Sequence, residues 1–240
     1  MLPDGTPTSP PQLVAAMESA AVARGSARFD MSGSLGGAGL ASVTGGYVFH
    51  SAEEIDFTTT VEFRDGGTTR TARAVGLGNA VYLRPPTRDG MPPGTEWIRR
   101  ARSDWEDPPE VTPVYNEAIR SINGIRDWSM IAAAAELVPV GTRTVDGERT
   151  TGYRARFEVL AAMRTEGVVG ASFRVLQDLY AQGARTVGFI VWVDGGYLPR
   201  SVLVSVPTDE GRLMAELNFH GWGEPVAPEA PPDELVWRRS

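Results

Sequence analysis

Cysteine and lysine are both absent from this sequence of 240 residues, and histidine occurs only twice, as His50 and His220. Without cysteine there are no disulfides, no thiolate nucleophiles and no zinc sites with sulfur ligands. Neither histidine belongs to a metal-ligand spacing or a recognisable nucleophile motif. We therefore expect no catalytic residues, no metal and no cofactor, and we predict that the protein is not an enzyme.

An excess of positive charge is also missing. All 23 basic residues are arginine, the formal net charge is -7 and the pI is about 5.0. Binding to nucleic acid needs a concentrated basic face, so a nucleic-acid partner is not expected. No apolar run approaches the roughly 20 residues that span a bilayer, and the first residues lack the pattern of a signal peptide.

The first regular element predicted is a helix from Gln12 to Arg24. Ser9 is a typical N-cap, Pro10 suits the first turn, and Gln12 completes a capping box. Gly25 is a typical helix stop. One side of this helix carries a modest apolar stripe made of Leu13, Met17, Ala20 and Ala21.

Most of the remaining sequence has the period of two that is typical of half-buried strands. The clearest run places apolar side chains and one threonine on one face of a strand: Ile55, Phe57, Thr59, Val61 and Phe63. Similar alternation returns at 153–159 and 213–219. Residues 186–193 (TVGFIVWV) are apolar on both faces, which predicts a central strand covered on both sides.

Four turns containing Asp and Gly join the predicted strands, at 65–67, 146–147, 194–196 and 209–211. Asp-Gly sequences tolerate the positive φ angles of tight hairpins. Successive hairpins predict an antiparallel meander and exclude doubly wound nucleotide-binding folds, which need crossover connections. Short helices are expected after Thr112, after Asp127 and over 170–182.

The glycine-rich piece 33–46 is not expected to bind phosphate. A phosphate-binding loop needs a strand before it and a helix N-terminus after it, whereas here a strand follows. Arg99, Arg100 and Arg102 follow Trp97 and could hold an anionic headgroup, although a solvated surface run is the favoured interpretation.

These patterns predict an α+β, mainly β fold: a large curved antiparallel sheet with several helices on its concave face. We expect one domain over 12–228, a flexible tether at 1–11 and a flexible tail at 229–240. The candidate ligand-binding residues are apolar and are expected to line that face: Phe57, Val61, Phe63, Tyr82, Phe157, Phe189, Val191, Leu217 and Phe219, with Leu176 and Tyr180 from the helix. The helices either fill the concavity or leave space for a ligand.

Several short segments resemble the LppX/LprG-type lipoproteins of actinobacteria, which share the open half-barrel of LolA-like carriers. Those segments are Ser26-Ala27-Arg28-Phe29, Ala80-Val81-Tyr82-Leu83, Glu96-Trp97-Ile98, Val145-Asp146-Gly147 with Tyr153, Val191-Trp192-Val193-Asp194, Leu198-Pro199-Arg200, and Phe219 through Val226. Together they span most of residues 12–228. The resemblance rests on pattern and not on a signature motif.

This resemblance implies an extracytoplasmic lipoprotein of the cell envelope, with a cavity between sheet and helices that accepts acyl chains. It also implies a lipid anchor on a cysteine upstream of Met1, which would be the only contact with a membrane. It brings no catalytic residues. The expected function is therefore binding or carriage of a lipid or other apolar small molecule. The alternative is an envelope sensor or scaffold that binds another protein and no ligand.

Overall fold

The computed structural model describes residues 6–34, 40–52, 54–65, 67–101, 128–164 and 170–238. The described helices are α1 (Pro10–Arg24), α3 (Ser129–Ala132), α4 (Val159–Ala162), α5 (Gly170–Ala181) and the 3-10 turn η2 (Asp233–Leu235). The strands are β1 (Ser26–Ser34), β2 (Leu40–Phe49), β3 (Ile55–Asp65), β4 (Thr68–Leu77), β5 (Ala80–Arg84), β6 (Trp97–Ala101), β7 (Glu136–Val145), β8 (Glu148–Glu158), β9 (Thr186–Val193), β10 (Pro199–Thr208), β11 (Gly211–His220) and β12 (Val236–Arg238).

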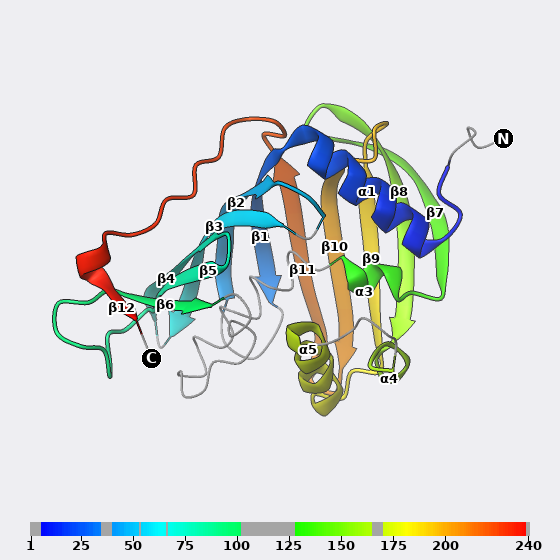
Figure 1. The fold of residues 1–240 in the computed structure, drawn as a ribbon. Helices are drawn as coiled ribbons and strands as arrows, with labels where there is room; N and C mark the ends of the chain where they lie inside the picture. The colour runs from blue at the N-terminus through cyan, green and yellow to red at the C-terminus, as the bar shows by residue number, and fades with distance from the viewer. Residues whose placement is uncertain are drawn as a thin grey trace.

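All of these strands form one curved sheet in the order β12-β6-β5-β4-β3-β2-β1-β11-β10-β9-β8-β7 (Figure 1). Two antiparallel meanders, β1 to β6 and β7 to β11, meet where β1 pairs with β11. The four predicted turns are hairpins, and Asp146 and Gly147 have the positive φ angles of 50° and 80° that such a turn needs. The predicted α+β, mainly β half-barrel is confirmed.

The C-terminal segment corrects one expectation. Within the predicted flexible tail 229–240, β12 pairs with β6 in a parallel register, and Glu96 N–H donates to Leu235 O at 2.8 Å. The segment leading to it crosses β1, where the Ser26 hydroxyl donates to Glu224 O at 2.6 Å. Parallel pairing with a distant strand leaves no local sequence pattern, which is why the tail looked unstructured.

Antiparallel pairing gives the sheet two distinct faces, because directly opposed residues point to the same side. One set of aligned residues runs Phe57–Gly76–Val81 across β3, β4 and β5. We call the face that holds this set the inner face and the opposite one the outer face. Strand β9 is buried at Val187, Phe189, Val191 and Val193 on the inner face only, so the prediction that it is covered on both sides is wrong.

Helix α1 has the predicted end, because Gly25 adopts a left-handed conformation with φ 78°. Its start differs from the prediction. Ser9 makes no capping hydrogen bond, and the Thr8 N–H and hydroxyl both donate to Gln12 Oε1 at 2.9 Å. The helices expected after Asp127 and over 170–182 are α3 and α5, and the one expected after Thr112 lies outside the described residues.

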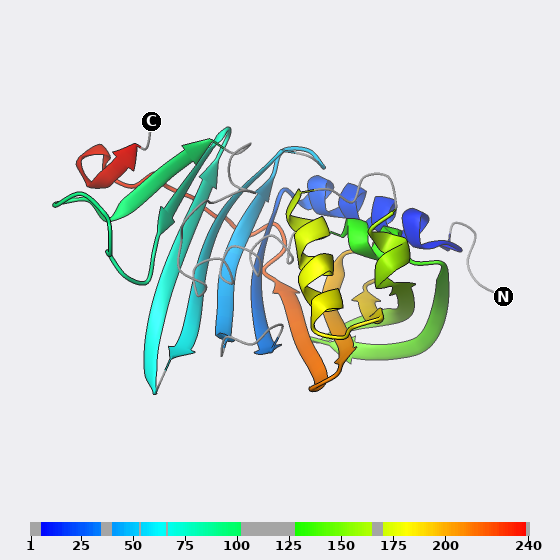
Figure 2. The ribbon, with the colours of Figure 1, turned by 90° about the horizontal axis from the view of Figure 1, so that it is seen from below.

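The described helices gather over one half of the inner face. Figure 2 shows α1, α3, α4 and α5 within the curve formed by β7 to β11, whereas among the described residues no helix covers β4 to β6. Fully buried side chains from these helices join the sheet in one hydrophobic core: Leu13 and Met17 of α1, Ile131 of α3, Val159 of α4 and Leu176 of α5. None of the described helices has both the length and the apolar character that a membrane span requires.

Candidate functional site

The inner face is apolar over most of its described width, and Thr59 of β3 and Arg100 of β6 are exceptions on it. Seven of the predicted ligand-binding residues are buried there, each with at most 6% of its surface exposed: Phe57, Val61, Phe157, Phe189, Val191, Leu217 and Phe219. The pairing register brings them to one side of the sheet from four strands. Whether each of them contacts a ligand stays a prediction.

Tyr82 does not belong to this set. It pairs with Val75, which pairs with Thr58, so all three lie on the outer face. Its neighbours Val81 and Leu83 occupy the inner face, 1% and 2% exposed. The segment AVYLR is apolar on both sides, so alternation alone could not decide which of its side chains would point inward.

The remaining predicted residues divide as follows. Leu176 of α5 is fully buried in the core. Tyr180 is half-buried, and the Arg185 guanidinium lies 4.4 Å from the centre of its ring. Phe63 belongs to β3, but its side chain lies outside the described part of the chain.

Described side chains pack against one another beneath α4 and α5. The rings of Phe157 and Phe189 lie 5.8 Å apart, and Val159 and Leu176 are fully buried. These residues are part of the hydrophobic core.

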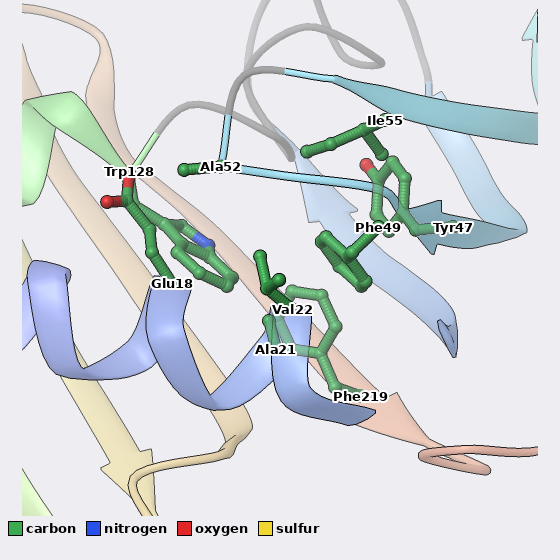
Figure 3. A pocket seen from close by; sticks show the side chains of 9 residues that line it. All are labelled: Glu18, Ala21, Val22, Tyr47, Phe49, Ala52, Ile55, Trp128 and Phe219. Atoms are coloured by element: carbon green, nitrogen blue, oxygen red, sulfur yellow. The ribbon is translucent and has the colours of Figure 1, made fainter. Parts of the chain in front are cut away.

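A pocket lies at the other end of the helical layer, between α1 and the β2–β3 hairpin (Figure 3). The space within it totals about 400 Å³, a figure that includes open solvent at its mouth. We call it the α1 pocket; its lining residues are Glu18, Ala21, Val22, Tyr47, Phe49, Ala52, Ile55, Trp128 and Phe219. Most of these side chains are apolar or aromatic, as is typical of sites for small hydrophobic ligands.

A chain of aromatic rings forms one side of the α1 pocket. Phe29 stacks on Tyr47 with ring centres 4.7 Å apart, and Tyr47 contacts Phe49 at 5.7 Å. Trp128 meets Phe219 edge to face at 6.2 Å. Aromatic pairs in these geometries stabilise one another beyond their simple burial, so this wall of the pocket is held firmly in place.

A glycine makes this aromatic stack possible. A Cβ at position 45 would lie 2.6 Å from Cζ of Phe29 and 2.2 Å from Thr58 O, so only glycine leaves room for the ring. Gly45 pairs with Phe29 on the neighbouring strand, which explains why the ring can lie across the backbone of β2.

Few polar groups reach the buried inner surfaces. Trp128 Nε1 and Thr59 Oγ1 are buried without a hydrogen-bond partner among the described residues. Burial also raises the pKa of Tyr153 above its ordinary value, and the nearby Tyr197 adds to the increase. The sheet therefore offers its interior mainly apolar surface.

The two histidines lie outside the α1 pocket. His50 Nε2 is 2.9 Å from Asp56 Oδ2, and His220 Nδ1 is 3.6 Å from Asp30 Oδ1, with both imidazoles 46% exposed. In the described ranges, no group of three or more His, Asp or Glu side chains could hold a metal ion. The glycine-rich piece 33–46 includes parts of β1 and β2, so a strand follows it as expected.

Sequence reasoning missed most of the α1 pocket. Tyr47 and Phe49 carry a period-two signal that could have identified them, but Gly45 and Gly46 interrupt the pattern. Trp128 gives no signal, because it is a single residue just before the short helix α3. These residues come from distant parts of the chain, and only the folded arrangement brings them together.

Among the solved structures that resemble this chain, two cover nearly its whole length with TM-scores above 0.5. LprF from Mycobacterium bovis superposes with a TM-score of 0.53 at 10% sequence identity, covering 94% of this chain and 99% of LprF. The lipoprotein LppX from Mycobacterium tuberculosis gives a TM-score of 0.51 at 13% identity, covering 92% of this chain and 98% of LppX. This chain has the LppX-type half-barrel fold.

The LppX-type fold confirms the resemblance drawn from the short sequence segments. At identities of 10% and 13% the likeness concerns the fold. No protein-family model and no curated protein matches the chain.

Proposed function

We propose that this protein binds a lipid or similar amphiphile, with the apolar part of the ligand in the α1 pocket and along the inner face beside it, and that it carries this ligand outside the cytoplasm. The observation that supports the proposal most directly is the α1 pocket itself, which opens to solvent and has a largely aromatic and aliphatic lining. We also propose that the protein has no enzymatic activity.

The driving force for such binding is the removal of apolar surface from water, at about 25 cal/mol per Å². The lining residues Phe49, Val22 and Ile55 offer this kind of surface without requiring a specific partner atom. An acyl chain fits such a lining better than a polar metabolite, because a polar ligand would lose its hydration without gaining hydrogen bonds.

A location in the cell envelope is part of the same proposal. Its support is the fold shared with LppX, which is named a lipoprotein. Fractionation of the native host with an antibody against this chain tests the location. Recovery in the cytosolic fraction alone would argue against it.

The alternative, a sensor or scaffold that binds another protein, lacks a supporting observation among the described residues. A docking face of that kind is expected to expose a contiguous apolar patch. The large exposed hydrophobic residues of the described part are Val140, Leu160 and Met214, which lie on the separate elements β7, α4 and β11. The lipid-binding proposal is therefore the one we develop.

Native mass spectrometry of protein purified from its own host tests the proposal. We expect bound lipid that is released by organic solvent, and we expect the emptied protein to bind the fluorescent apolar probe N-phenyl-1-naphthylamine. A protein that carries no lipid and does not enhance the fluorescence of the probe would overturn the proposal.

A further inference from the structure

Trp128 presents a hydrogen-bond donor that the described protein does not use. The side chain is 9% exposed, and its indole nitrogen is buried with no acceptor in reach among the described residues. The indole N–H can only donate. Buried polar groups in proteins are almost always hydrogen-bonded, so a donor left in this state requires an explanation.

A second tryptophan in the same chain of aromatic rings shows that the fold can supply a hydrogen-bond acceptor to an indole N–H. Trp222 stacks on Phe49 at 6.0 Å and contacts Phe219 at 5.9 Å, and its Nε1 donates to Pro199 O at 3.2 Å. Trp128 has a comparable aromatic neighbourhood but lines the α1 pocket. The unsatisfied donor therefore coincides with the pocket.

The surroundings of this donor are apolar. Figure 3 shows the indole of Trp128 at the edge of the α1 pocket, with its nitrogen on the side of the ring that faces Ala52 and the β2–β3 hairpin. Val22 and Phe49 stand across the same space. An acceptor supplied here by a ligand would be attached directly to an apolar body.

The charge of the pocket limits the kind of acceptor. Of the nine lining residues, Glu18 alone has a carboxyl group, and none is basic. A ligand carboxylate would enter beside this acidic side chain and lose its hydration without meeting a positive charge among these lining residues. An uncharged carbonyl oxygen accepts the same hydrogen bond without this cost.

We propose that the α1 pocket selects uncharged amphiphiles whose ester or amide carbonyl is next to an apolar chain, and that Trp128 is the specificity residue whose Nε1–H donates to that carbonyl oxygen. This inference rests on the proposed lipid-binding function and names the ligand class for it. A plain hydrocarbon lacks the acceptor, and a free fatty acid carries a charge that Glu18 disfavours.

Three probes with matched chains separate these possibilities: methyl palmitate, hexadecane and sodium palmitate. Each competes with N-phenyl-1-naphthylamine for the delipidated full chain. Trp128→Phe removes the donor and keeps an aromatic ring, and Trp192→Phe, on the outer face, is the matched control. We expect Trp128→Phe to weaken the binding of methyl palmitate by about fivefold, which is the contribution of one net hydrogen bond. The affinity for hexadecane should not change.

Glu18→Gln tests the charge preference separately. We expect this variant to tighten binding of palmitate and to leave methyl palmitate unchanged, because only the carboxylate interacts with the charge at Glu18. Equal palmitate affinities for the variant and the wild type would contradict the part of the inference that concerns charge.

A spectroscopic measurement on the wild type covers the case in which Trp128→Phe does not fold. The indole N–H resonance of Trp128 in a ¹⁵N-labelled sample should move downfield with methyl palmitate and not with hexadecane. If methyl palmitate binds but this resonance does not move downfield, the inference is overturned and the proposed function stands. If none of the three probes competes with wild-type protein, the proposed function itself fails.

Discussion

The ring of Phe57 lies directly over the backbone of Gly76 on the neighbouring strand. A Cβ at position 76 would come within 2.2 Å of Cε1 of Phe57. The two residues form a direct pair between β3 and β4 on the inner face. Here a glycine in a strand interior provides space for an aromatic side chain that would otherwise have to point elsewhere.

Gly76→Ala should therefore destabilise the protein by about 1 to 3 kcal/mol, because the added methyl group overpacks a filled position. Urea unfolding measures this change in the free energy of unfolding. Gly195→Ala is the control, since no atom lies within 4 Å of a Cβ there. A control that costs as much as Gly76→Ala would show that the contact with Phe57 is not responsible.

Filling the α1 pocket should weaken the binding of an apolar probe. Ala52 is exposed and lines the pocket, so Ala52→Trp places a ring across the opening. We expect N-phenyl-1-naphthylamine to bind about tenfold more weakly, which corresponds to about 1.4 kcal/mol of binding free energy. Ala15→Trp, exposed on α1 outside the pocket, should retain wild-type affinity. Unchanged probe binding in Ala52→Trp would show that the probe binds at another site.

The β9–β10 hairpin depends on Asp194. Its carboxylate accepts hydrogen bonds from the N–H groups of Gly196 and Leu198 at 2.9 and 3.0 Å, and from Arg200 at 2.8 Å. The side chain is 12% exposed. Asp194→Ala should therefore lower the free energy of unfolding by about 2 to 4 kcal/mol, since it leaves several donors and a half-buried charge without a partner.

Asp233→Ala is the comparison for that experiment. Asp233 pairs with Arg238 at 2.8 Å, but both side chains are largely exposed, at 80% and 62%. Thermal unfolding should detect a loss below about 1 kcal/mol, as is usual for surface ion pairs. Similar losses for Asp194→Ala and Asp233→Ala would contradict the role assigned to burial.

Tyr153 should make stability sensitive to alkaline pH. Its raised pKa means that the folded state holds the phenol proton more tightly than the unfolded chain does. The associated stability is fully present below the ordinary pKa of 10.0 and is lost as pH rises through the higher folded-state value. The chain has no lysine, so few other side chains titrate in this range.

Tyr153→Phe should therefore flatten the decline in the free energy of unfolding above a pH of about 10. Urea unfolding at several pH values measures the slope. Tyr82→Phe, on the outer face, is the matched control and should keep the wild-type pH dependence. An undiminished slope in Tyr153→Phe would assign the decline to another group.

The elements that were predicted correctly are those whose signals are local. The strand at 55–63 alternates strictly. Asp146-Gly147 closes the β7–β8 hairpin with the expected positive φ angles. Gly25 ends α1 as predicted. In each case a short stretch of sequence contains the whole physical cause, so no distant contact was needed.

The predictions were wrong where a strand could turn either of two apolar faces inward, or where a strand pairs with a partner far away in the sequence. Tyr82 was assigned inward because the segment AVYLR is apolar on both faces, and the pairing of β5 with β4 turned Val81 and Leu83 inward. The strand β12 was missed because three residues become a strand only by pairing with β6.

By itself, the sequence determined the strands, the tight turns and the meander, because these follow from periodicity and residue chemistry along the chain. Only the tertiary structure decided where the described helices pack on the inner face and where the α1 pocket lies. That outcome depends on how α1, the β2–β3 hairpin and Trp128 pack together. Packing of this kind is a property of distant surfaces in contact, and a linear pattern does not encode it.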